Sequence, residues 1–118
     1  MKTILVVDDE KHICLLYEEE LSDAGYHVVT ASNGRQALEL IARQTPDLVL
    51  LDIKMPEMDG AEFLRQLREF NTDLPIIIST AYGDYMQQDY SVWLSDDYFV
   101  KSADIDVLKA KVRDILGE

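Results

Sequence analysis

Cysteine, basic residues and long apolar runs are all scarce in this sequence. The single cysteine among 118 residues, Cys14, cannot form an internal disulfide, and its apolar neighbours predict a semi-buried helical position rather than a reactive thiol. No apolar stretch approaches the roughly 20 residues of a membrane span, and the N-terminus lacks a signal-peptide pattern. We therefore expect a cytoplasmic protein without a disulfide framework and without a segment that enters a membrane.

The scarcity of basic residues limits the possible partners. Eleven Lys and Arg stand against 23 Asp and Glu, which gives a formal net charge of -12 at pH 7. A chain this acidic repels phosphate backbones and anionic lipid surfaces, so we expect no direct binding of nucleic acid or of a membrane. An acidic excess alone usually means only a solvated surface. A metal or partner site must therefore be argued from where the acids lie.

What the sequence does contain is an alternation of short apolar runs and longer stretches with helical spacing. A chain of 118 residues fits one domain with a substantial core, and we expect a single domain over residues 1–118. The apolar runs, which predict strands, cover residues 3–7, 26–31, 47–51, 75–80 and 97–100. The first and third runs are continuously apolar, as in strands covered on both faces. We predict an α/β fold of (βα)5 type, with a doubly wound, parallel, five-stranded sheet in the flavodoxin-like strand order 2-1-3-4-5.

The helical stretches differ in how clearly they show an apolar face. The first should end at Gly25 and turn one apolar face inward, made of Ile13, Leu16, Tyr17, Leu21 and Ala24. Others cover about 34–44 and 105–115, and Asp59 with Glu62 resembles a capping box before a further helix. The stretch over 84–94 has modest helix propensity, so we expect its helix to be the least stable.

Carboxylates follow two of the predicted strands directly. Asp8 and Asp9 come after the first apolar run, and Asp52 comes after the third. Ligands of doubly wound sheets bind beyond the carboxyl ends of the strands, and this strand order makes the first and third strands neighbours. Unit charges about 4 Å apart repel by roughly 4 kcal/mol at an effective dielectric of about 20. Such a cluster binds protons or a cation, and all-oxygen ligands favour Mg²⁺.

Two further strand ends carry complementary groups. Thr80 offers a hydroxyl and Lys101 an ammonium, which together suit a phosphoryl group, with a carboxylate as the nucleophile that gives an aspartyl phosphate. Each residue alone has an ordinary interpretation, because residues 8–10 could be helix N-terminal charge, Asp52 could open a turn, Thr80 could cap a helix and Lys101 could lie in solvent. Their coincidence at four strand ends favours the phosphoryl site.

At this point the sequence closely resembles the receiver domain of bacterial two-component response regulators. The resemblance covers essentially the whole chain and rests on four motifs in the order and spacing of that family. They are VVDDE at 6–10, LLDIKMPEMDG at 50–60, STAYGD at 79–84 and DDYFVK at 96–101. The resemblance implies that Asp52 is the phosphoacceptor. It also implies that Asp9 and Asp52 bind Mg²⁺ directly, that Asp8 acts through a water, and that the backbone carbonyl of Lys54 completes the site.

The resemblance also implies a switch and its partners. Thr80 would be the hydroxyl that moves toward the phosphate, Tyr98 the aromatic residue that follows it, and Lys101 the phosphate-binding cation. The surface formed by residues 84–94, 97–100 and 105–115 would then change its preference for a downstream protein target or an output domain. The donor would be a phosphohistidine on a sensor histidine kinase or phosphotransfer protein. We expect no enzymatic activity beyond the domain's own phosphorylation and dephosphorylation, and a monomer, with a phosphorylation-dependent dimer as an alternative.

Two other functions remain open on the sequence alone. Most receivers follow the strand-end lysine with proline, whereas Lys101 is followed here by Ser102, for which we predict a trans peptide bond. This departure and the weak helix over 84–94 allow a degenerate receiver that acts as a constitutive protein-binding module. A Mg²⁺-dependent phosphohydrolase with an aspartyl nucleophile is disfavoured. Such enzymes usually place a second Asp two residues after the nucleophile, where this chain has Lys54, and there is no cap insertion.

Overall fold

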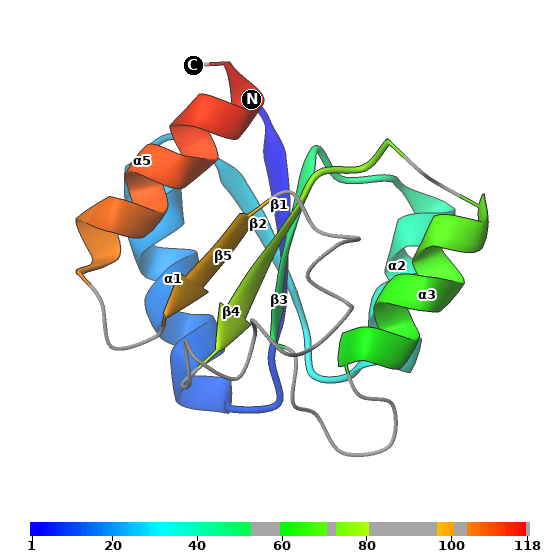
Figure 1. The fold of residues 1–118 in the computed structure, drawn as a ribbon. Helices are drawn as coiled ribbons and strands as arrows, with labels where there is room; N and C mark the ends of the chain where they lie inside the picture. The colour runs from blue at the N-terminus through cyan, green and yellow to red at the C-terminus, as the bar shows by residue number, and fades with distance from the viewer. Residues whose placement is uncertain (53–59, 71–72, 81–96, 101–103, 118) are drawn as a thin grey trace.

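The computed structural model describes residues 1–52, 60–70, 73–80, 97–100 and 104–117 (Figure 1). The strands are β1 (Thr3–Val7), β2 (His27–Ala31), β3 (Leu48–Asp52), β4 (Ile76–Thr80) and β5 (Asp97–Val100). The helices are α1 (Lys11–Asp23), α2 (Gly34–Arg43), α3 (Gly60–Phe70) and α5 (Ile105–Leu116). All five predicted strands are present. The third is shifted by one residue from the predicted 47–51, because Asp52 belongs to the strand itself and residue 47 does not.

The strands form one parallel sheet in the order β2-β1-β3-β4-β5, which confirms the predicted topology. β1 lies between β2 and β3, so Ile4 pairs with Val28 on one side and with Leu48 on the other. Helices α1 and α5 cover one face of the sheet, and α2 and α3 cover the other (Figure 1). Crossovers to opposite faces leave β1 and β3 as neighbours whose carboxyl ends lie side by side.

Two apolar layers form the core, one on each face of the sheet. The alternation of side chains along each strand assigns successive residues to opposite layers. The layer under α2 and α3 contains Leu5, Val7, Ala31, Ala37, Ile41, Val49, Leu51, Phe63, Leu64, Leu67, Leu74, Ile76 and Ile78. The layer under α1 and α5 contains Ile4, Val6, Cys14, Tyr17, Leu21, Tyr26, Leu48, Leu50, Ile77, Leu108 and Val112. This double coverage explains why β1 and β3 read as continuous apolar runs.

Helix α1 packs on a narrower stripe than the one predicted, with Ile13, Tyr17 and Leu21 turned inward as expected. Its buried residues are Cys14, Tyr17 and Leu21, as expected for residues three and four positions apart. The placement of Leu16 and Ala24 on the inward face was wrong, since Leu16 is 47% exposed and Ala24 is also exposed. The helix is turned so that the aromatic ring of Tyr17, rather than Leu16, fills the space above the sheet. The predicted semi-buried position of Cys14 is confirmed.

Side chains satisfy the backbone at the ends of two helices. Asn33 accepts a hydrogen bond from the Gln36 N–H at 2.8 Å before α2, and Asp104 accepts one from the Asp106 N–H at 2.9 Å before α5. Gly117 ends α5 with a φ of 75°, a left-handed conformation that favours glycine. None of the helices in the described part of the chain is long and apolar enough to cross a membrane.

Several sequence predictions fall on residues outside the described ranges. They concern the capping residue Asp59, the helix over 84–94 and the peptide bond between Lys101 and Ser102. In α3, Glu62 accepts hydrogen bonds from the Arg65 guanidinium and from the Gln66 amide. These bonds, with the charge of Arg65, hold the pKa of the Glu62 carboxyl below its usual range.

Candidate functional site

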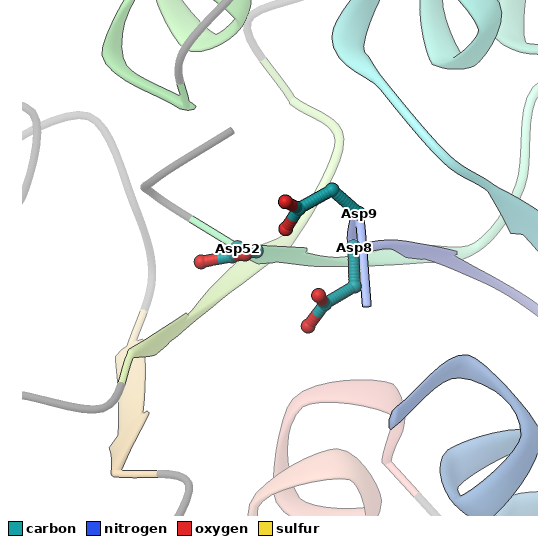
Figure 2. A group of neighbouring side chains, drawn as sticks. All are labelled: Asp8, Asp9 and Asp52. Carbon is teal, nitrogen blue, oxygen red and sulfur yellow. The ribbon is translucent and has the colours of Figure 1, made fainter. Parts of the chain in front are cut away.

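The predicted acidic cluster forms where β1 and β3 end. Asp52 is the last residue of β3, while Asp8 and Asp9 directly follow β1 (Figure 2). Each of the three offers a carboxylate oxygen, and these oxygens lie within 4.8 Å of one another. The register explains the convergence. Val6 pairs with Leu50 and Val7 with Leu51, so the next residues along the two strands meet at the same edge of the sheet.

Asp8 is held in place by several hydrogen bonds and is only 2% exposed. Its N–H donates to the Ala31 carbonyl at 3.0 Å, which extends the β1–β2 ladder by one step. Its carboxylate accepts from the Glu10 N–H at 2.9 Å, and its carbonyl accepts from the Cys14 thiol at 3.3 Å. These bonds connect the acidic residue to the first turn of α1 and to the next strand. The position of the carboxylate is therefore set by the backbone around it.

Asp9 and Asp52 differ in their access to solvent. Asp52 is 6% exposed at the end of a buried strand, whereas Asp9 is exposed. The cluster therefore has a buried side and an open side. Hard carboxylate oxygens combined with access for water suit Mg²⁺, which retains several waters when it binds to proteins. The donor set therefore fits the predicted metal.

The remaining predicted site residues are only partly described. Thr80 ends β4, and its backbone pairs with Val100 of β5. The Tyr98 backbone lies in β5 opposite Ile78. Lys54 and Lys101 lie outside the described residues. The structure thus brings Asp8, Asp9 and Asp52 together and brings the Thr80 backbone to the same edge of the sheet.

Two features of the site did not follow from the sequence. Ser79 is 1% exposed and pairs in register with Asp52, whereas the sequence interpretation considered only the next hydroxyl, that of Thr80. The β3–β4 register that pairs these two residues could not be read from one sequence. The second feature is a pocket of about 270 Å³ beside the acids, lined by Asp8, Asp9, Lys11, Cys14, Thr30, Ala31, Ser32 and Gln36.

Comparison with known proteins identifies the family. The family model of the response regulator receiver domain matches residues 4–113. The chain is a response regulator receiver domain. It is thus a component of two-component signalling, and the resemblance drawn from the four motifs is confirmed.

Solved structures of receiver domains have the same fold. The response regulator TrrA from Thermotoga maritima, in complex with Mg²⁺ and beryllium fluoride, superposes with a TM-score of 0.92 at 46% identity, covering 98% of this chain and 99% of TrrA. A structure of the histidine kinase ThkA in complex with TrrA matches with a TM-score of 0.91 and the same identity, covering 98% of this chain and 99% of the matched chain.

Curated relatives of this receiver domain differ in length. Sporulation initiation phosphotransferase F from Bacillus subtilis is 40% identical over 96% of this chain and 92% of its own length. A probable transcriptional regulator, ycf27 of Guillardia theta, is 43% identical over 96% of this chain but only 44% of its own length. The chain therefore spans less than half of the longer relative.

Proposed function

We propose that this receiver domain accepts a phosphoryl group on Asp52 from a phosphohistidine of a sensor histidine kinase or phosphotransfer protein. The observation that carries the proposal is the convergence of the Asp8, Asp9 and Asp52 carboxylates within 4.8 Å at the carboxyl edge of the sheet. Three acids in one place have no packing role and repel one another, so the arrangement suits a cation and an incoming phosphoryl group. Phosphorylation would then change the partner preference of the surface that includes β5 and α5.

The proposed reaction is a direct phosphoryl transfer. A carboxylate oxygen of Asp52 attacks phosphorus, so an O–P bond forms while the N–P bond of the phosphohistidine breaks and its electron pair stays on the imidazole nitrogen. Bound Mg²⁺, held by Asp9 and Asp52 with Asp8 through a water and the Lys54 carbonyl, would supply positive charge for the phosphoryl oxygens. The Thr80 hydroxyl and the Lys101 ammonium would bind these oxygens after transfer. Water later attacks phosphorus, the O–P bond to Asp52 breaks, and inorganic phosphate leaves while the carboxylate of Asp52 is restored. The domain would then act only on itself.

The partners follow from the same chemistry. Binding of the kinase ThkA by TrrA supports a histidine kinase as donor. On this chain, Leu15 and Leu16 are 57% and 47% exposed, and they lie in the second turn of α1, the helix that follows Asp8 and Asp9. Exposed leucines next to a reactive site suit a helical protein partner that must bring its histidine to Asp52. The proposed output is a downstream protein or a joined output domain, and the unphosphorylated form is a monomer.

The test is intact-mass spectrometry after incubation with acetyl phosphate. We expect a phosphoryl adduct on the wild type that requires Mg²⁺, disappears with EDTA and is absent from Asp52→Asn. Glu18→Gln, which removes one exposed carboxylate of α1, is the matched control and should be labelled like the wild type. A folded wild type that stays unlabelled, beside another receiver domain that is labelled in the same buffer, would refute the proposal. The constitutive binding module would then be the better function.

A further inference from the structure

Ser79 carries a buried hydroxyl group at the same edge of the sheet as the acidic cluster. It lies next to the last residue of β4, it is 1% exposed, and its Oγ has no hydrogen-bond partner among the described residues. Burial of a hydroxyl without a partner costs free energy, and alanine would fit the same place without that cost. An apolar residue is the normal occupant of such a position, as its strand neighbours Ile77 and Ile78 illustrate. A hydrogen-bond acceptor supplied by a ligand would therefore remove the cost of burying this hydroxyl.

The register places Ser79 beside the phosphoacceptor. Asp52 and Ser79 are paired residues of β3 and β4, and side chains paired in this way point to the same face of a parallel sheet. Two residues earlier, Leu50 and Ile77 are also paired, and both belong to the core layer under α1 and α5. Side chains alternate along a strand, so Asp52 and Ser79 continue that layer to the edge of the sheet.

The same row includes Asp8. Val6 is paired with Leu50 and lies in the same layer, so the next residues of this face are Asp8, directly after β1, and Asp52 on β3. Asp8, Asp52 and Ser79 are the three buried polar or charged residues of the described chain. They therefore form one row at the carboxyl ends of β1, β3 and β4, with Asp52 in the middle. Adjacent strands lie only about 4.8 Å apart, so rotation about one χ1 angle brings a serine hydroxyl within reach of the neighbouring side chain.

We infer that Ser79 is a positioning residue for the phosphorylated state, in which its hydroxyl donates a hydrogen bond to an oxygen of the acyl phosphate on Asp52. The inference rests on the proposed phosphorylation of Asp52. In the free protein the hydroxyl has no partner among the described residues, and phosphorylation provides additional acceptor oxygens next to it. A phosphoryl group beside the hydroxyl would offset the cost of burying it. Ser79 favours the phosphorylated form over the free form.

The alternative is that Ser79 is simply a small residue in a tight place. Three substitutions separate the two roles. Ser79→Ala removes the hydroxyl, Ser79→Thr keeps it, and Ser79→Val has the shape of threonine without the hydroxyl. If Ser79 matters only for packing, its size decides, and Ser79→Thr and Ser79→Val should behave alike. If Ser79 acts as a hydrogen-bond donor, Ser79→Thr should behave like the wild type and Ser79→Val like Ser79→Ala.

The experiment measures binding of beryllium fluoride with Mg²⁺ by titration calorimetry, together with unfolding in urea without ligands. We expect Ser79→Ala to unfold at the same or a higher urea concentration than the wild type, yet to bind beryllium fluoride about tenfold more weakly, which corresponds to about 1.4 kcal/mol. Ser79→Thr should bind like the wild type and Ser79→Val like Ser79→Ala. The lifetime of the acetyl phosphate adduct should shorten in the same two variants.

Two results would overturn the inference. One is wild-type affinity and lifetime in Ser79→Ala, and the other is equally weak binding by Ser79→Thr and Ser79→Val. Parallel measurements on the wild type and Asp52→Asn distinguish a failure of the proposed function from a failure of the role of Ser79. If the wild type fails to bind beryllium fluoride, phosphorylation of Asp52 itself is refuted and the inference falls with it. If the wild type binds beryllium fluoride but the Ser79 variants give either of these two results, only the role of Ser79 is refuted.

Discussion

Neutralising Asp9 should stabilise this receiver domain in the absence of a metal. Asp9 is the exposed member of the acidic cluster, so Asp9→Asn removes a charge without leaving a buried group unsatisfied. At 4.8 Å, the upper limit of the distances between the three carboxylate oxygens, two unit charges repel by about 3.5 kcal/mol at an effective dielectric of about 20 and by about 0.9 kcal/mol at that of water. Because Asp9 is exposed, the value for water is the appropriate one. The repulsion of Asp9 by the Asp8 and Asp52 carboxylates together is then about 2 kcal/mol.

Mg²⁺ should cancel this advantage. A ligand that binds only the folded state stabilises it by about 2.7 kcal/mol at a concentration of 100 times its Kd. The wild type gains this free energy, whereas Asp9→Asn lacks one proposed ligand and gains less. Asp9→Asn should therefore be more stable than the wild type in EDTA, but equally stable or less stable at high Mg²⁺.

Urea unfolding followed by circular dichroism, in EDTA and in Mg²⁺, measures both effects. Removal of any acid reduces the magnitude of the net charge of -12, so the control is Glu18→Gln on the exposed side of α1. Equal free energies of unfolding for Asp9→Asn and Glu18→Gln in EDTA would show that repulsion within the cluster is negligible. An Asp9→Asn variant that is stabilised by Mg²⁺ as strongly as the wild type would exclude Asp9 as a metal ligand.

The other predictions concern α1 and α3. Tyr17→Ala should cost about 3–4 kcal/mol of stability because Tyr17 is buried, whereas Leu16→Ala should cost under about 1 kcal/mol; equal losses in urea unfolding would contradict the observed stripe. The Cys14 thiol should react with a thiol reagent only after denaturant is added, and rapid labelling of the native protein would disprove its burial. The lowered pKa of Glu62 means that its stabilising effect is present above the unfolded value of about 4.3 and is lost as the pH falls through the lower folded value. Glu62→Gln should therefore destabilise the protein slightly at pH 7 and leave its stability unchanged below the folded pKa, and an effect independent of pH would argue against the ion pair with Arg65.

The sequence was sufficient to predict the sheet and the acidic cluster, for a physical reason. Strands buried on both faces must be apolar throughout, so β1 and β3 stand out, and a carboxylate at the end of such a run is unusual enough to notice. Once β1 and β3 are neighbours, Asp8, Asp9 and Asp52 have to meet. This part of the prediction depended only on composition, periodicity and strand order.

The details that were wrong or missed depend on tertiary contacts. Leu16 and Tyr17 are adjacent on α1, and the helical period alone allows either to face the sheet. The choice is made by packing, in which the larger ring of Tyr17 is buried and Leu16 remains in solvent. The pairing of Ser79 with Asp52 depends on the β3–β4 register. A shift by one residue would have placed Thr80 there instead, and no local feature of the sequence decides between them.

The position of the chain ends has a consequence for how a signal can leave this domain. The start of β1 and the end of α5 lie together at the end of the sheet opposite the acidic cluster (Figure 1). A segment joined at either terminus therefore starts at the end of the sheet that lies farthest from the acidic cluster. The acidic cluster and the chain termini are thus separated by the length of a five-residue strand, about 16 Å. A neighbour that stays at that end would respond to a change at Asp52 only through the body of the fold, which then acts as the connection between the two ends of the sheet.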